Sequence, residues 1–295
     1  MYDIGAIYEA ANVPDAIRLL DEHPNARIIA GGSDVLVQIR GGKLAGSDLV
    51  SIYMLDEARG IEKESDGTIR IGSLTSFSHI TNDPIIQKHI NVLGEAVDQV
   101  GSPQIRAIGT IGGNTCNGVT SADSASTLFA LDALIEIAGP TGRRVEPIAK
   151  FYLGPGKVDL AHNEIQTAIL IPKKSYTGYK GHYIKYGMRK AMEIATLGCS
   201  VNVRLSRDKK SFRDIRIAYG VAGPVPLRAS YAERFGKEQP VTMETVEKVS
   251  RAVLEDVHPR DSWRASKDFR SHLCVTMAKE ALLEASRLAG GIINE

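Results

Sequence analysis

The sequence predicts an α+β protein of two domains, one over residues 1–175 and one over residues 176–295. Three observations predict it. Strand-like and helical patterns alternate up to residue 171, a polar and turn-rich stretch follows at residues 172–178, and three strand-like runs then precede two or three helices. With 295 residues, of which 43% are hydrophobic, the chain can bury a core and is long enough for two domains or one large one.

The first domain opens with a helical pattern at residues 13–20, and an apolar strand at residues 27–30 then runs into Gly31 and Gly32. Ser33 and Asp34 follow in the position of helix caps, which predicts a helix over residues 35–40. Hairpin turns and apolar spacing predict the remaining elements. We expect strands at residues 60–63, 68–71, 133–138, 143–147 and 165–171, and helices at residues 76–80, 84–100 and 125–131.

The second domain is predicted as a three-stranded antiparallel sheet followed by helices. Residues 207–210 are polar and charged, as expected at the tip of a hairpin. We expect strands at residues 179–188, 195–205 and 212–221, and helices at about residues 229–235, 243–256 and 262–288.

Charge and terminal composition exclude several classes of partner. Lys and Arg total 36 and Asp and Glu total 35, and a net charge of +1 argues against nucleic acid or an anionic membrane surface. The first residues lack the basic and apolar regions of a signal peptide, and no apolar run reaches the ~18 residues that span a bilayer. We therefore expect a cytoplasmic protein that binds neither nucleic acid nor membrane.

Cysteine and histidine usage gives no sign of a metal site. Cys116, Cys199 and Cys274 are odd in number and far apart, which fits neither a disulfide framework nor an iron–sulfur spacing. The seven histidines show no HxxxH or HExxH spacing. We expect this chain to hold no metal or cluster, and we interpret Cys116 as a small buried packing residue.

The first of two glycine-rich segments joins the strand at residues 27–30 to the helix at residues 35–40. A glycine pair at such a junction lets the backbone approach a ligand, and the free N–H groups of the first helical turn favour a pyrophosphate. Asp34 would repel a phosphate through its charge, so its backbone N–H is its expected contribution. A tight turn with a helix cap explains the segment equally well.

The second glycine-rich segment, residues 109–118, lies in a longer run of small and polar residues. It has little side chain to pack, which suits a surface where backbone meets ligand. The alternative is a solvated loop. The groups able to hydrogen-bond the sugar and phosphate oxygens of a nucleotide are those of Thr110, Asn114, Thr115, Ser121 and Asp123. The chain lacks GxxxxGK[ST] and a GxGxxG after a strand, so a P-loop or Rossmann site is not expected.

At residues 30–36, 103–106, 110–114 and 121–125 the chain resembles the FAD-binding (medium) subunits of the molybdenum hydroxylases, and among them those of the bacterial xanthine dehydrogenases. The likeness covers essentially the whole chain and includes residues 154–157, 185–189 and 262–267. It implies a vanillyl-alcohol-oxidase-like FAD-binding domain of two α/β subdomains, over residues 1–175. A C-terminal domain of a three-stranded antiparallel sheet with helices would follow.

The resemblance also implies which residues contact FAD. The first pyrophosphate loop would comprise Ile29, Ala30, Gly31, Gly32, Ser33, Asp34 and Val35, and the second contact region Thr110, Gly113, Asn114 and Asp123. Lys185 matches a lysine near the flavin, although a solvated strand lysine beside Arg189 and Lys190 is the alternative. Ile165 and Gln166 fall where the family has an apolar contact, and Gln166 departs from that pattern, which leaves open which of the two touches the cofactor.

The function implied by the resemblance is electron relay. A molybdenum-cofactor subunit would oxidise a purine or another heterocycle, and a [2Fe–2S] subunit would pass the electrons to FAD and on to NAD+ or another acceptor. We expect no catalytic acid, base or nucleophile in this chain. Two alternatives remain: a stand-alone flavin oxidase or reductase of the same fold, and a non-catalytic assembly protein that has lost the cofactor.

Overall fold

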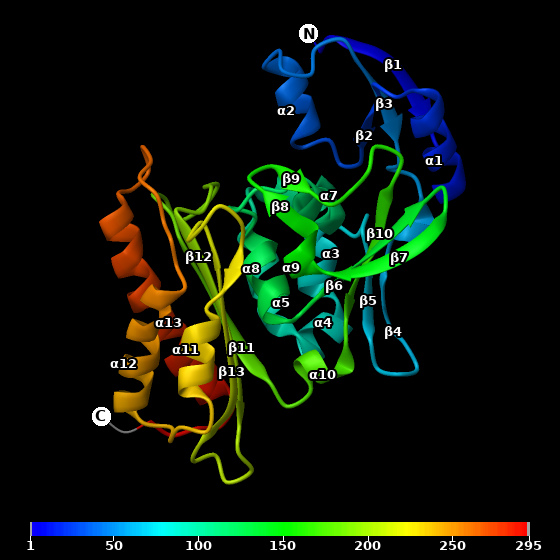
Figure 1. The fold of residues 1–295 in the computed structure, drawn as a ribbon. Helices are drawn as coiled ribbons and strands as arrows, with labels where there is room; N and C mark the ends of the chain where they lie inside the picture. The colour runs from blue at the N-terminus through cyan, green and yellow to red at the C-terminus, as the bar shows by residue number, and fades with distance from the viewer. Residues whose placement is uncertain (1, 294–295) are drawn as a thin grey trace.

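Three successive sheets, each packed on its own hydrophobic cluster, divide the chain along its sequence in the computed structural model, which describes residues 2–293 (Figure 1). The N-terminal sheet lies at one end, helices lie between the middle and C-terminal sheets, and further helices cover the outer face of the last sheet. The predicted division after residue 175 coincides with the passage from the middle sheet to the last one, and as a domain boundary it stays a prediction.

The N-terminal unit is a parallel sheet of order β1-β3-β2 with two helices. Its elements are β1 (Ile4–Glu9), α1 (Val13–Glu22), β2 (Arg27–Ile29), α2 (Val35–Arg40) and β3 (Ser47–Ser51). The side chain of Asn12 caps α1 by accepting the N–H of Asp15. The predicted side-chain cap of α2 is wrong, because Asp34 makes no such bond and instead accepts from the side chain of Gln38.

The middle unit is a five-stranded antiparallel sheet of order β4-β5-β10-β6-β7 under a layer of short helices. Its strands are β4 (Ile61–Lys63), β5 (Ile69–Gly72), β6 (Leu134–Gly139), β7 (Gly142–Pro147) and β10 (Ile165–Ile171), and β8 (Tyr152–Gly154) pairs with β9 (Lys157–Val158) beside it. Its helices are α3 (Phe77–Asn82), α4 (Pro84–His89), α5 (Asn91–Val97), α6 (Pro103–Ile108), α7 (Ile111–Cys116), α8 (Asp123–Ala130) and α9 (Ile148–Phe151), with a 3-10 turn, η1 (Asp56–Ala58), before β4.

Both predicted hairpins of the middle unit are confirmed, and one predicted helix is not continuous. The helix expected over residues 84–100 breaks between α4 and α5 at Ile90, whose φ of −141° lies outside helical geometry. The Ile90 side chain is 2% exposed, so its burial in the hydrophobic cluster accompanies the break.

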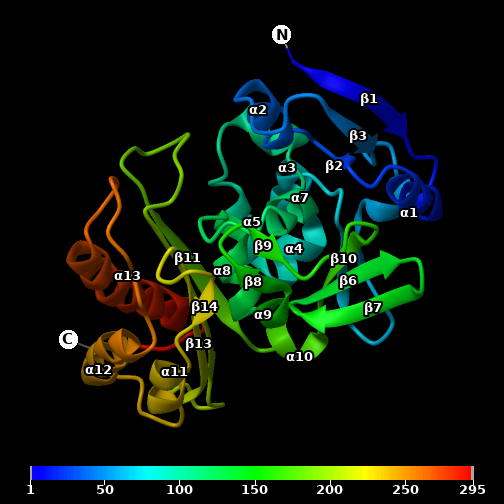
Figure 2. The same ribbon diagram turned by 45° about the horizontal axis from the view of Figure 1, so that its top comes forward.

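The C-terminal unit is an antiparallel sheet of order β11-β12-β13-β14, entered through α10 (Lys173–Tyr176). The three predicted strands are β11 (Lys180–Tyr186), β12 (Leu197–Leu205) and β13 (Phe212–Gly220), and a fourth, β14 (Leu227–Arg228), was not predicted because it has two residues. The helices α11 (Ser230–Gly236), α12 (Met243–Ala252) and α13 (Lys267–Leu288) cover one face, with a 3-10 turn, η2 (Val253–Glu255), after α12. Helices α5 and α8 lie on the other side (Figure 2). Strand β12 is therefore almost wholly buried.

Polar contacts join the last sheet to the middle unit. The buried Arg216 on β13 donates to the carbonyl oxygens of Ala130 and Ser175 at 3.3 and 3.1 Å. His182 on β11 lies 3.2 Å from a carboxylate oxygen of Glu95 on α5, measured from its Nδ1. Within residues 2–293, no helix is long and apolar enough to cross a bilayer.

The His182–Glu95 contact predicts a pH dependence of stability. The hydrogen bond that His182 donates to the Glu95 carboxylate raises the pKa of His182 above its usual value. The stabilisation is therefore fully present below the unfolded pKa, about 6.5, and is lost as pH rises through the higher folded pKa. We expect the unfolding free energy of the wild type to fall from pH 6 to pH 8 relative to His182→Gln. Denaturant unfolding across that range measures it, with His272→Gln as the exposed control, and parallel pH profiles for wild type and His182→Gln would contradict the assignment.

Candidate functional site

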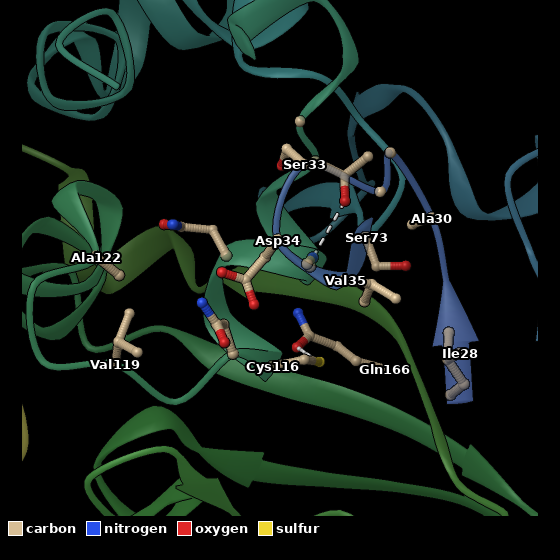
Figure 3. A pocket seen from close by; sticks show the side chains of 18 of the residues that line it. Ile28, Ala30, Ser33, Asp34, Val35, Ser73, Cys116, Val119, Ala122 and Gln166 are labelled. Atoms are coloured by element: carbon tan, nitrogen blue, oxygen red, sulfur yellow. Dashed lines mark hydrogen bonds between the residues drawn. The ribbon is translucent and has the colours of Figure 1, made fainter. Parts of the chain in front are cut away.

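A cavity of about 850 Å³ lies between the N-terminal unit and the helices of the middle unit (Figure 3). Both glycine-rich segments line it. Residues 30–35 lie on one side, and Gly109, Thr110, Gly112, Gly113 and Asn114 lie on the other. The sequence placed these segments far apart in the chain, and the fold brings them to one site.

Gly31 is required for contact between the two sides of the cavity. A Cβ atom at this position would lie 2.0 Å from the carbonyl oxygen of Ile108, the last residue of α6. Real Cβ atoms do not approach so closely, so any side chain at Gly31 forces the loop away from α6. Gly112 is constrained in the same way, because a Cβ atom at this position would lie 2.7 Å from the carbonyl oxygen of Ser73. These glycines are needed first to pack backbone on backbone.

The loop at residues 31–35 presents a row of backbone donors. Among residues 2–293, no acceptor is found for the N–H groups of these five consecutive residues, whereas the N–H groups of Leu36 and Gln38 bond to carbonyl oxygens of Gly32 and Asp34. Gly32 has a φ of +71°, which only glycine adopts readily and which turns the chain into α2. Consecutive free N–H groups at such a turn form a concave anion site.

The second glycine segment differs from its prediction. It is neither a loop nor a free surface, because residues 111–116 form α7 and Thr110 caps it by accepting the N–H of Gly113 at 3.1 Å. The N–H groups of Ile111 and Gly112 are taken by the carbonyl oxygens of Thr75 and Ser73. What this segment offers a ligand is therefore the side chains of Thr110 and Asn114 and the close approach at Gly113.

Two buried polar atoms in the cavity wall have no partner within the described part of the chain, the amide nitrogen of Gln166 and the hydroxyl of Ser73. The amide oxygen of Gln166 is fixed, because it accepts from the Thr115 hydroxyl at 2.8 Å and the Cys116 thiol at 3.1 Å. Its nitrogen is thereby turned toward the cavity (Figure 3). A buried donor without an acceptor costs about 1–3 kcal/mol, and a ligand oxygen would recover it.

Cys116 is a lining residue as well as a packing residue. The sequence predicted a small buried side chain, but Cys116 is partly exposed and contacts the cavity. Burial of its sulfur raises the pKa of the thiol to about 12, so the thiol stays protonated at neutral pH. It can donate a weak hydrogen bond to Gln166 and is not a nucleophile.

A buried ion pair supports the wall formed by the start of α8. The ammonium group of Lys185 lies 2.7 Å from a carboxylate oxygen of Asp123 and 2.9 Å from the carbonyl oxygen of Gln99, and both charged side chains are 8% exposed. The Tyr183 hydroxyl donates to the other oxygen of Asp123 at 3.1 Å. Burial raises the pKa of Asp123, while Lys185 and Tyr183 act in the opposite direction.

Of the residues predicted to contact the cofactor, most line the cavity. These are Ala30, Gly31, Gly32, Ser33, Asp34, Val35, Thr110, Gly113, Asn114, Asp123 and Ile165. Ile29 and Lys185 are not among the lining residues: Ile29 ends β2 just before the loop, and Lys185 lies behind Asp123. Ile165 and Gln166 both line the cavity, so both are placed where they could contact the cofactor.

Other lining residues had no signal in the sequence. Ser73 follows β5, Val158 and Leu160 lie at and after β9, and Met192 and Ile194 come from the loop between β11 and β12. These residues carry no motif, and they reach the cavity only through contacts between segments distant in the chain. The buried hydroxyl of Ser73, which has no hydrogen-bond partner in the described part of the chain, could be found only from the structure.

Comparison with known proteins places the whole chain among flavoprotein subunits. Residues 2–174 match the FAD binding domain in molybdopterin dehydrogenase, and residues 182–285 match the CO dehydrogenase flavoprotein C-terminal domain. The chain is 44% identical over 291 residues to the xanthine dehydrogenase FAD-binding subunit of Escherichia coli O157:H7, covering 99% of each protein.

A carbon monoxide dehydrogenase provides a more distant relative and a structural match. The chain is 30% identical to the medium chain of this enzyme from Hydrogenophaga pseudoflava, over 92% of this chain and 93% of that one. A solved structure of the enzyme from the same organism, which lacks the Mo-pyranopterin moiety of the molybdenum cofactor, superposes with a TM-score of 0.91 at 29% identity, over 98% and 99% of the two chains.

The Asp123–Lys185 pair yields a double-mutant test. Lys185→Met leaves a buried carboxylate without its cation, and we expect a loss of about 3 kcal/mol in unfolding free energy. Asp123→Asn in the same chain removes the unpaired charge, so the double variant is expected to be more stable than Lys185→Met alone. Denaturant unfolding at neutral pH checks this, with the exposed Lys150→Met as control. Additive losses in the double variant would show that the two side chains are not coupled.

Proposed function

Because the chain belongs to the family of FAD-binding subunits of the molybdenum hydroxylases, we propose that it relays electrons from the [2Fe–2S] clusters of a partner subunit, through FAD, to NAD+ or another acceptor. A third subunit with the molybdenum cofactor would oxidise the substrate, and the similarity to xanthine dehydrogenase subunits makes a purine the first substrate to test. We place the complex in the cytoplasm, where three unpaired thiols such as those of this chain are stable.

The row of free N–H groups at residues 31–35 carries this proposal. Pyrophosphate is the one part of FAD with a concentrated negative charge, and a concave row of N–H donors compensates it without a basic side chain. Ala30 lines the same wall beside this row, Val35 is the last member of the row, and Ile29 precedes both at the end of β2. A cavity of about 850 Å³ is at the upper end of the range for small-molecule and cofactor sites, as a dinucleotide requires.

The opposite wall supplies individual polar groups to the cofactor. Thr110 keeps its hydroxyl proton for a ligand, because the hydroxyl oxygen accepts the N–H of Gly113. Asn114 is oriented by the Ser124 hydroxyl, which donates to its amide oxygen at 2.6 Å, so its amide nitrogen is available as a donor. Gly113 and Ile165 would contribute close backbone approach and apolar contact.

Lys185 and Asp123 act as a unit in this proposal. When bound, FAD would supply the chemistry of taking up electrons one at a time from one-electron carriers and of releasing them to an acceptor singly or as a pair. Negative charge grows on the flavin when it is reduced, and a nearby cation favours that form. Lys185 is already paired with Asp123, so the two charges together act on the flavin as a buried dipole. The electrostatic stabilisation of the reduced flavin by this dipole is smaller than that by a free ammonium group.

The loop between β11 and β12 fits the proposed iron–sulfur partner. Met188, Met192 and Ile194 are 60%, 63% and 52% exposed, and the last two also line the cavity. Exposed apolar side chains grouped in one loop are typical of a protein contact. A cluster that reduces the flavin must lie close to it, so a partner seated on this loop would be in the required place.

Two experiments separate this proposal from its alternatives. Purification of the native complex should recover this chain with iron–sulfur and molybdenum subunits, and the complex should reduce NAD+ with a substrate from a purine panel. Recovery of the chain alone with flavin, active without partners, would favour a stand-alone oxidase or reductase. A purified chain with no flavin absorbance, and none after FAD is added, would favour the assembly protein.

The Gln166 amide predicts a specific loss of FAD affinity. Gln166→Glu keeps an oxygen for Thr115 and Cys116 but removes the buried donor, so we expect the FAD dissociation constant to rise about tenfold or more. Thr115→Val is the matched control, because it removes a buried partner of the same amide and leaves the donor intact. Its FAD affinity should stay within about twofold of wild type. Equal affinity in Gln166→Glu and wild type, by flavin fluorescence titration, would rule out this contact.

A further inference from the structure

A second cavity, of about 420 Å³, lies at the end of the C-terminal sheet where α10 meets β12 and β13. Figure 1 shows α10 beside that end of the sheet, away from the N-terminal unit. Five basic side chains line it. One of them, Arg216, is paired with acidic residues, and the other four come from separate segments: Lys174 on α10, Arg204 on β12, Arg213 on β13, and Lys237 after α11. We call these four residues and the space between them the basic pocket.

None of the four cations of the basic pocket has an ion pair within residues 2–293. Two acidic residues also line the cavity, Asp214 and Glu238. Asp214 is engaged elsewhere, because it accepts from the Tyr179 hydroxyl and lies 3.5 Å from the guanidinium of Arg216. Only Glu238 is left to offset four positive charges, although the chain as a whole is almost neutral at +1. Such a concentration of like charge is unfavourable unless an anion joins it.

The pocket is built around an ordered aromatic side chain. The guanidinium groups of Arg204 and Arg216 lie 4.9 and 4.3 Å from the ring centre of Tyr179. Tyr179 itself is 8% exposed and cannot move aside. Stacking fixes the plane of the Arg204 guanidinium and leaves its edge for hydrogen bonds. The Nε atom of Arg204 is buried and has no hydrogen-bond partner in the described part of the chain.

Arg216 holds the surrounding elements in place. It is paired with Asp132 at 3.1 Å and donates to carbonyl oxygens of Ala130 and Ser175, so it belongs to the frame of the pocket. The turn that carries Lys237 is fixed as well, because the N–H of Glu238 donates to the carbonyl oxygen of Phe212 at 2.7 Å. The four segments with the free cations are therefore tied to one another before any ligand arrives.

We propose that the basic pocket binds a phosphate group, either free phosphate or the phosphate of a small organic molecule. Arginine edges and lysine ammonium groups are the side chains that recognise phosphate oxygens, and a dianion matches several unpaired cations better than a single carboxylate does. The volume of about 420 Å³ accommodates an organic group beside the phosphate.

The basic pocket is distinct from the flavin cavity. Tyr179 precedes β11, and Lys185, which contacts the lining residue Asp123 of the flavin cavity, is near the end of that strand. Six residues of extended chain, roughly 20 Å, therefore lie between the two sites, and no residue lines both. The phosphate site therefore does not depend on the proposed electron relay, and the two can fail separately.

Calorimetric titration of the FAD-loaded protein with inorganic phosphate tests the proposal, with chloride at matched ionic strength as reference. Wild type should give saturable binding. Lys174→Gln with Arg213→Gln removes two exposed cations of the pocket and should weaken it at least about tenfold. Arg207→Gln with Lys210→Gln removes the same charge from the adjacent hairpin tip and should leave it within about twofold. Flavin absorbance, followed throughout, reports the flavin cavity independently.

A parallel titration with AMP distinguishes the two sources of the phosphate group. Tighter binding of AMP than of inorganic phosphate, lost in the Lys174→Gln/Arg213→Gln variant, identifies a phosphorylated organic ligand, and equal binding identifies free phosphate. No saturable binding in wild type, or binding of equal strength in both double variants, overturns the proposal.

Discussion

The contact between Gly31 and the carbonyl oxygen of Ile108 is the constraint on which the site depends. It joins the N-terminal unit to α6 at a distance that no side chain permits, and it sets the spacing between the loop at residues 31–35 and α7 across the cavity. The free N–H groups of that loop, the orphaned amide of Gln166 and the side chains of Thr110 and Asn114 face one space only because this contact is made. A flavin dinucleotide needs donors at both ends of such a space.

Much of the fold follows from local patterns. The strand, glycine turn and helix at residues 27–40, both hairpins of the middle unit and the three long strands after residue 178 all lie where alternation and turn residues predicted them. The failures have tertiary causes. Burial of Ile90 accompanies the break in a helix, β14 is too short to have a pattern, and Asp34 bonds to Gln38 in preference to capping its own helix.

The sequence predicted which two segments line the site, but it did not predict which groups each segment offers to a ligand. Both glycine segments line the cavity, but only residues 31–35 offer free backbone donors, and the N–H groups at the start of α7 are spent on Ser73 and Thr75. The partner of Lys185 is 62 residues away in the chain, so no spacing rule indicates that Asp123 neutralises it. The same holds for Ser73 and the β11–β12 loop, whose place in the wall exists only in the folded chain.

The flavin content of two glycine variants tests the central claim most directly. Gly31→Ala would place a methyl group against the Ile108 carbonyl oxygen, whereas a Cβ at Gly154 meets nothing within 4 Å. Measured as FAD per chain in the purified complex, Gly31→Ala should retain at most about a tenth of the wild-type flavin and Gly154→Ala all of it. Full flavin content in a stably folded Gly31→Ala complex would contradict the account.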